Sequence, residues 1–164
     1  MRKQKGFSLI ELLIVVAIIL IIAAIAIPNL MRARMSANEA SAVGSVRSIN
    51  TAEISYNAAY SNIGFTTTLA QLGGAVGAAC VPGTATGCFI DSSLSSGAKS
   101  GYTFTLALGT AGVGVPLNDY SITAKPTVPN QSGTRYFCSF EDAVIRSSAT
   151  AITNPCPPAT LALQ

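Results

Sequence analysis

The sequence contains no histidine, and few of its residues carry a charge. Without histidine, neither a Ser-His-Asp nor a Cys-His catalytic group can be built, and imidazole ligands for a metal ion are excluded. Charged residues make up 10% of the 164-residue chain, whereas soluble domains commonly contain about a quarter. Hydrophobic residues make up 49%, which excludes a disordered, charge-rich tail protein. The length allows one domain of ordinary size and one appendage.

The charge that the chain does carry is unevenly distributed. Arg2, Lys3 and Lys5 lie within the first six residues, and the other seven Lys and Arg residues equal the seven Asp and Glu residues in number. The body of the protein is therefore neutral and lacks the basic surface of a nucleic-acid-binding protein. We expect no nucleic-acid contact.

Motifs that would hold a cofactor are also missing from the sequence. The glycine-rich run at 73–77 is not followed by the Gly-Lys-Ser/Thr of a phosphate-binding loop. The four cysteines show no Cys-x-x-Cys spacing, so a tetrathiolate zinc site is not expected. Their number fits two disulfides if the body lies outside the cytoplasm. We expect no cofactor, no metal ion and no enzymatic activity.

A long apolar segment follows the basic cluster. The 25 residues from Phe7 to Met31 contain a single charged residue, Glu11. A helix needs about 20 predominantly apolar residues to cross a bilayer, so this segment is long enough to span one. The basic cluster should stay on the cytoplasmic side, which places the C-terminal body outside.

A signal peptide, a simple anchor and a buried core helix are the competing interpretations of this segment. A secretory signal peptide has a similar basic start and apolar middle, and Ala24-Ile25-Ala26 resembles its cleavage site. The length of the run and the carboxylate of Glu11 argue against it, because a charge in hydrocarbon is costly without a partner. A simple membrane anchor accounts for neither Gly6 nor Glu11, and a chain this small could hardly surround a core helix of this length.

The next segment has the spacing of an amphipathic helix. Intervals of three, four and seven residues place five apolar or aromatic residues on one face, while Glu39, Arg47 and Glu53 are expected largely off it. The five are Ala42, Val46, Ile49, Tyr56 and Tyr60. A helix from Phe7 to about Tyr60 would be about 80 Å long, so its first half should project and be covered by lipid or by sibling helices.

The rest of the chain changes from loop composition to strand periodicity. Residues 61–100 are rich in Gly, Ser, Thr and Ala and are expected to connect the helix to a sheet, with one helical turn within 66–72. Alternation with a period of two then predicts strands at 102–108, 120–124 and 135–140 and a short one at 143–146. Short connections favour antiparallel pairing, Glu141 and Asp142 are expected in a turn, and the expected core aromatics are Tyr56, Tyr60, Tyr102, Phe104 and Tyr136.

The N-terminal residues resemble the class III signal of type IV pilins and type II secretion pseudopilins. The resemblance begins with Lys5-Gly6-Phe7-Ser8-Leu9-Ile10-Glu11-Leu12 and continues through Ile14-Val15-Val16-Ala17-Ile18 and Ala23-Ala24-Ile25-Ala26-Ile27-Pro28. It is close over about the first 30 residues and holds only in outline beyond them.

The resemblance implies a role for four residues. Prepilin peptidase would cut after Gly6, Phe7 would become the N-methylated first residue, Glu11 would be needed for assembly, and Pro28 would kink the helix. Cleavage would expose an ammonium on Phe7, which gives Glu11 a possible partner in a neighbouring subunit. Leaving either charge unpaired in an apolar core is costly, so the pair could set subunit register.

The resemblance also implies an α+β fold. A long N-terminal helix, membrane-spanning in its first half, would pack by its second half on a small antiparallel sheet. Of the three possible connectivities, it favours disulfides Cys80–Cys88 and Cys138–Cys156. The expected organisation is a leader at 1–6, an assembly helix at 7–31, its amphipathic continuation at 32–60, a connecting loop at 61–100, and the sheet with a C-terminal disulfide loop at 101–164.

The sequence therefore predicts a structural subunit of a type IV pilus-like filament, made as a prepilin. The implied partners are identical or related subunits, prepilin peptidase, an inner-membrane assembly platform and lipid. The precursor would lie in a bacterial inner membrane, and the product in an extracellular pilus, serving roles such as adhesion or motility, or in a periplasmic pseudopilus. A pseudopilin of type II secretion and a conventionally secreted or anchored binding domain remain alternatives.

Overall fold

The computed structural model describes residues 7–74, 77, 79–108, 117–153, 155–156 and 161–162. The expected leader, with Gly6, lies outside these described residues. The chain divides into two compact units, residues 1–34 and 35–164. We call the second unit the head.

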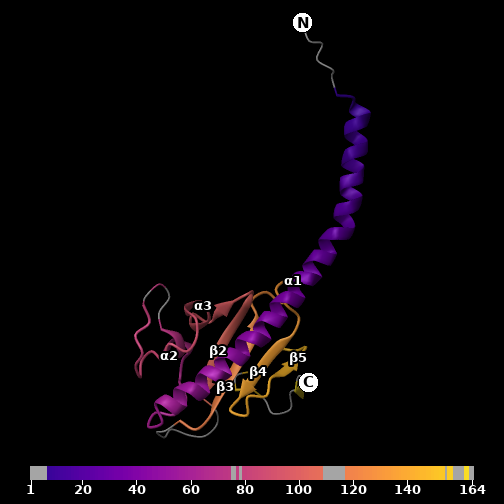
Figure 1. Cartoon of the computed structure of the whole chain (residues 1–164). Helices are drawn as coiled ribbons and strands as arrows, with labels where there is room; N and C mark the ends of the chain where they lie inside the picture. The colour runs from indigo at the N-terminus through magenta and orange to yellow at the C-terminus, as the bar shows by residue number, and fades with distance from the viewer. Residues whose placement is uncertain are drawn as a thin grey trace. The chain divides into compact units, whose positions relative to one another are not determined.

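Helix α1 spans Leu9–Ala59 and contributes to both units. Its first half consists almost wholly of Leu, Ile, Val and Ala, and Pro28 lies inside it without ending it. Within the head, the second half of α1 lies over the strands (Figure 1). The buried residues of this half include Ala42, Val46, Ile49 and Tyr56, all of which are 0% exposed. The predicted amphipathic face is therefore present.

Two of the three charged residues that the sequence placed off this face are in fact buried on it. Glu39 is 7% exposed and Glu53 is 0% exposed, whereas Arg47 is exposed as expected. The reason is helical spacing: Glu53 follows Ile49 by four residues and precedes Tyr56 by three, so all three share one face. Polar partners from the loop and the sheet make this burial tolerable, as shown below.

The sheet has six strands in the order of the chain, and every neighbouring pair is antiparallel. The strands are β1 Ala98–Lys99, β2 Tyr102–Leu108, β3 Tyr120–Pro126, β4 Tyr136–Phe140, β5 Arg146–Ser148 and β6 Leu161–Ala162. The helix and this sheet form the expected α+β fold. Ile122 and Ala124 of β3 and Phe137 of β4 are buried in the core beneath α1.

The three long predicted strands are present, but the predicted short one is displaced. Instead of 143–146, β5 begins at Arg146. A turn occupies the earlier residues: the Ala143 N–H donates to the Phe140 carbonyl at 2.8 Å, and Ala143 has a φ of 56°. β1 lies inside the expected connecting loop, and β6 was not expected. Two-residue strands are too short to show a period.

One predicted core aromatic lies on the wrong face of its strand. Phe137 of β4 is 0% exposed and pairs with Ala124, which is also in the core. Tyr136 is its chain neighbour and is only half-buried. Since successive side chains of a strand point to opposite faces, Phe137 replaces Tyr136 in the core. Tyr56, Tyr102 and Phe104 are core residues as predicted, and Tyr60 packs against them partly buried.

Two short helices occupy the connecting region. Helix α2 spans Leu69–Gly73, and helix α3 spans Ser92–Ser95. The carboxylate of Asp91 caps α3 by accepting the Leu94 N–H at 2.8 Å. The helical turn expected within 66–72 thus begins at Leu69.

Two disulfides fasten the loops of the head. Cys80 bonds Cys88, and Cys138 of β4 bonds Cys156 near the C-terminus. This is the pairing that the family resemblance implies. The Cys156 N–H also donates to the hydroxyl of Ser121 at 2.7 Å. Ser121 is buried and alternates with the core residues of β3, so the C-terminal loop covers the sheet face opposite α1.

Candidate functional site

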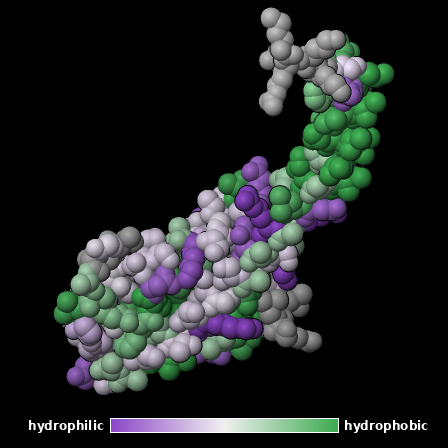
Figure 2. All heavy atoms as spheres, turned by 45° about the horizontal axis from the view of Figure 1, so that its top comes forward, coloured by the Kyte–Doolittle hydropathy of each residue, from purple (hydrophilic) through white to green (hydrophobic). Residues whose placement is uncertain are grey.

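The most unusual surface of the molecule is the first half of α1. Its large apolar side chains are exposed, from Phe7 at 82% and Leu9 at 80% to Met31 at 46%. They form a hydrophobic surface along this unit in Figure 2. Monomeric soluble proteins rarely expose contiguous apolar patches above a few hundred Å². This segment therefore needs another body to cover it.

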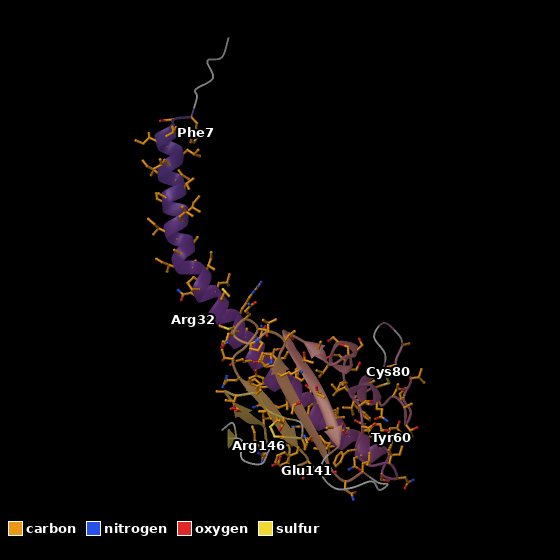
Figure 3. The ribbon with its side chains drawn as sticks, turned by 180° about the vertical axis from the view of Figure 1, so that it is seen from behind. Phe7, Arg32, Tyr60, Cys80, Glu141 and Arg146 are labelled. Atoms are coloured by element: carbon orange, nitrogen blue, oxygen red, sulfur yellow. A yellow bond between two sulfur atoms is a disulfide. The ribbon has the colours of Figure 1, made fainter. Side chains whose placement is uncertain are left out.

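The dimensions of this segment fit a bilayer. Among the described residues, α1 is the one helix long and apolar enough to cross a membrane. The 25 residues from Phe7 to Met31 measure about 37 Å as a helix, against about 30 Å for the hydrocarbon core. Phe7 and Arg32 mark its two ends (Figure 3). Removing each large aliphatic side chain from water contributes about 1.5–3 kcal/mol.

Glu11 is the only charged residue in this apolar segment. It lies in the first turn of α1, where its Oε2 accepts the backbone N–H of Ser8 at 2.9 Å. A carboxylate at this position also benefits from the positive end of the helix dipole. Phe7 precedes Glu11 by four residues, and the two lie at the same end of the segment. The structure thus places Glu11 close along the chain to the predicted new N-terminus.

Pro28 interrupts the backbone bonding of α1 near the other end of the segment. Proline has no N–H to donate to the carbonyl four residues earlier, and its ring crowds that carbonyl. The helix nevertheless continues to Ala59. The kink at Pro28 therefore stays a prediction. Beyond it, Arg32 and Arg34 are exposed and end the apolar run.

Two buried carboxylates on the head portion of α1 were missed at the sequence level. Glu39 Oε1 accepts the Thr134 N–H and hydroxyl, both at 2.8 Å, and its Oε2 lies 2.7 Å from Arg135 Nε. Burial alone would raise the pKa of Glu39, but these hydrogen bonds outweigh it and lower that pKa. Helical spacing relative to Ala42 and Val46 was the available signal. These contacts fasten α1 to the start of β4.

Glu53 has a different environment. Its carboxylate accepts the Thr66 N–H at 2.9 Å and the Thr66 hydroxyl at 2.5 Å. Burial raises the pKa of Glu53 to about 7, although the bonds from Thr66 act in the opposite direction. The contact fastens the connecting region to α1. No group of three or more potential metal ligands occurs in the part of the chain that the structure describes.

Comparisons with known proteins match the same N-terminal segment. Residues 1–27 match the family model of the prokaryotic N-terminal methylation motif. The chain is 67% identical over 39 residues to the type IV wide pilus major component PilA4 of Thermus thermophilus, which covers 24% of this chain and 30% of that protein. It is 44% identical over 54 residues to the type IV major pilin protein PilA of Myxococcus xanthus, which covers 33% of this chain and 24% of that protein.

The similarity is thus confined to a part of each protein. The chain spans less than a third of the length of these curated relatives, and no solved structure matches it. The match to the family model nevertheless includes Gly6, Phe7 and Glu11 and ends beside Pro28. The N-terminal segment of this chain is thus similar to that of type IV pilins, and the head has the α+β fold expected from that resemblance.

Proposed function

We propose that this protein is a structural subunit of a type IV pilus-like filament, made as a prepilin. The observation that carries the proposal is the exposed apolar half of α1 with its single carboxylate, Glu11. The head, by contrast, buries its large apolar side chains in a core of its own. Both relatives are described as major pilus components. The role is structural, and no catalytic step is assigned to the chain.

Processing would convert the precursor into an assembly-competent subunit. Prepilin peptidase would cut between Gly6 and Phe7 at the cytoplasmic face, where glycine leaves the cleavage site free of a Cβ. The cut removes the positive charges of Arg2, Lys3 and Lys5. It also creates an ammonium on Phe7, which N-methylation need not neutralise.

The apolar helix would hold the subunit in the inner membrane before assembly, with the head in the periplasm. Assembly exchanges lipid contacts for contacts with sibling helices. Hydrophobic burial alone cannot drive this exchange, because lipid tails are as apolar as leucine side chains. Helix packing, charge pairing and an assembly platform in the membrane must supply the direction.

Glu11 would supply the charge pairing. In an apolar bundle its carboxylate would bind the Phe7 ammonium of a neighbouring subunit. Breaking a buried ion pair by removing one partner costs about 3–5 kcal/mol, because the other charge remains unpaired. A subunit shifted along the bundle would leave both charges unpaired, so the pair favours one register. A kink at Pro28 would adjust the path of the helix in the bundle.

Two measurements test this proposal. Mass spectrometry of the mature protein should find an N-methylated Phe7 as the first residue.

Glu11→Ala should still be cut and membrane-held, but its content in sheared filaments should fall by about tenfold or more, since a tenfold change needs only about 1.4 kcal/mol. Ser8→Ala is the matched control, because it keeps the carboxylate and the backbone N–H and should assemble normally. Normal incorporation of Glu11→Ala would overturn the role of Glu11.

A pseudopilin of a type II secretion system is the second candidate. The same N-terminal motif serves both kinds of subunit. The disulfide that closes the C-terminal loop, Cys138–Cys156, favours a pilin. Shearing cells and probing the released surface filaments for this chain separates the two, because a pseudopilus stays in the periplasm.

A conventionally secreted or anchored domain is the candidate from another class. Its signal peptidase would cut after Ala26 and leave Ile27 as the first residue. The same N-terminal analysis would detect this product. A mature protein beginning at Ile27 would overturn the prepilin proposal as a whole.

A further inference from the structure

The outer edge of β2 is only partly paired. β1 pairs with Tyr102 and Thr103, and the Gly97 carbonyl accepts the Phe104 N–H at 2.7 Å. β2 continues to Leu108 and pairs with β3 along its full length. Because alternate residues direct their backbone groups to the same edge, Leu106 presents its N–H and C=O away from β3. No described strand pairs with them.

A groove of about 270 Å³ runs beside this open edge. Its walls come from β2, from the start of α2 and from the residues between α3 and β1, and none of them is charged. They include Thr67, Thr68, Leu69, Ser96, Phe104 and Leu106. Proteins commonly protect a strand edge with lysine, proline or a bulge. The lining of this groove contains none of these, and no described strand occupies the edge at Leu106.

A segment near the C-terminus repeats the sequence of this edge. Thr105-Leu106-Ala107-Leu108 in β2 and Thr160-Leu161-Ala162-Leu163 are identical tetrapeptides. The second includes β6, which is held to β5 by only two residue pairs. β6 ends the strand order, so no described strand pairs with its other edge. The sheet therefore carries the same uncharged sequence at or beside each of its two ends.

These two edges cannot meet within one copy without closing the sheet. β2 and β6 are separated by β3, β4 and β5. At about 4.8 Å per strand, the separation is about 19 Å. A second copy of the chain is therefore the occupant that can bring β6 to β2.

We propose that β6 of one copy adds to the open edge of β2 in a second copy, which joins the two heads through a shared sheet. The strand-adding segment would pair with the N–H and C=O of Leu106, which no described strand contacts, and its lack of charge matches the groove. The two contributing surfaces differ, so the contact can repeat from copy to copy without closing. This contact goes beyond the proposed function, because it lies in the head and does not involve Glu11.

Photo-cross-linking of the full chain in lipid vesicles tests this contact. One copy carries p-benzoyl-phenylalanine at the exposed Thr105, and the other is isotopically heavy and carries no cross-linker. We expect mass spectrometry to find the heavy C-terminal segment, 157–164, joined to residue 105. The same cross-linker at Thr103 is the matched control: it lies on the same strand and face, but β1 covers its edge. Its yield should be lower by about tenfold.

Removing residues 161–164 from the heavy copy gives a second test. Capture at residue 105 should then fall to the level of the Thr103 control, while the near-ultraviolet circular dichroism of the head stays unchanged. Equal yields from positions 105 and 103, capture of a different heavy segment, or no capture would each overturn the proposal. The Glu11→Ala variant should cross-link normally, so a failure of the proposed helix pairing is distinguishable from a failure of this contact.

Discussion

Two glutamates on the buried face of α1 are held by opposite electrostatic arrangements. Glu39 forms an ion pair with Arg135. The guanidinium of Arg135 is half-exposed, so this ion pair borders on water. Glu53 is fully buried, and no ion pair with it occurs among the described residues. Its negative charge helps to raise the pKa values of two nearby tyrosines, Tyr56 on α1 and Tyr120 on β3, although burial is the larger cause for both. Ionised Glu53 therefore opposes folding, and only the two bonds from Thr66 offset its burial.

This arrangement predicts a pH dependence of head stability. The pKa of Glu53 is raised from 4.5 to about 7 in the folded protein, so the folded state binds its proton more tightly than the unfolded chain does. The stabilising contribution is complete below the unfolded pKa and is lost as the pH rises through about 7. We expect the free energy of unfolding to fall by up to about 3 kcal/mol between pH 5 and pH 8. Urea denaturation of the detergent-solubilised chain measures it.

Glu53→Gln is the control for this pH dependence. Glutamine keeps the size of the side chain and one acceptor for Thr66 but does not titrate, so its stability should be nearly constant over the same range. The lowered pKa values of Glu39, Asp91 and Asp142 act at more acidic pH and do not compete. An equal slope in both proteins would show that Glu53 is not the responsible group.

At the residue scale, the sequence predicted the apolar helix and its motif but not these two glutamates. Glu11 stood out because it interrupts an apolar run. Glu53 did not, because a charged residue in a mixed helix is usually solvated, and its burial depends on a distant hydroxyl, that of Thr66. The partner residues come from loops without periodicity. Only the angular position of Glu53 between Ile49 and Tyr56 signalled its burial.

The two disulfides constrain different elements of the head. Cys80–Cys88 closes a short loop with a sequence separation of 8, and Cys80 is exposed. Cys138–Cys156 spans a separation of 18, and both residues are buried. It joins the middle of β4 to the loop that covers Ser121. Its loss releases more chain and exposes more of the sheet.

We therefore predict that the second disulfide contributes more to stability. In the chain-entropy model, a cross-link over a loop of about 15 residues contributes about 3 kcal/mol, and a shorter loop contributes less. Replacing Cys138 and Cys156 with alanine should lower the free energy of unfolding by at least this amount, because a covered face is also opened. The same replacement of Cys80 and Cys88 is the comparison. Denaturation midpoints of the two variants measure the difference, and an equal or reversed order would contradict this assignment.

Strands were predictable where the alternation of apolar and polar residues extended over enough positions to be recognised. β2 was predicted at 102–108, where the structure has it, because its seven residues alternate with a period of two. Its antiparallel pairing with β3 was predicted from the short connection between the two strands. β1 and β6 have two residues each, so only the tertiary pairing defines them. The displacement of β5 has a local cause, the turn at Ala143, whose positive φ the sequence did not indicate.

At the scale of the whole molecule, the two units differ in what they need from their surroundings. The first exposes its apolar side chains, and none of its described residues belongs to the core. The head contains every residue of the hydrophobic core cluster, from Ala42 to Ile145, together with both disulfides. From the sequence, the first half of the helix is expected to project and to be covered by lipid or sibling helices, because nothing in this small chain can cover it.

The division predicts that the head is self-sufficient. A chain that begins at Met35 loses no core residue and neither of the glutamate contacts, so it should fold and stay soluble without detergent. The full chain should need detergent or lipid, since its apolar helix otherwise associates. Size-exclusion chromatography with light scattering and circular dichroism compare the two. We expect the thermal midpoints of the two chains to lie within a few degrees of each other, which corresponds to a stability difference of at most about 1 kcal/mol. An unfolded truncated chain would instead show that the apolar half of α1 is required for the head to fold.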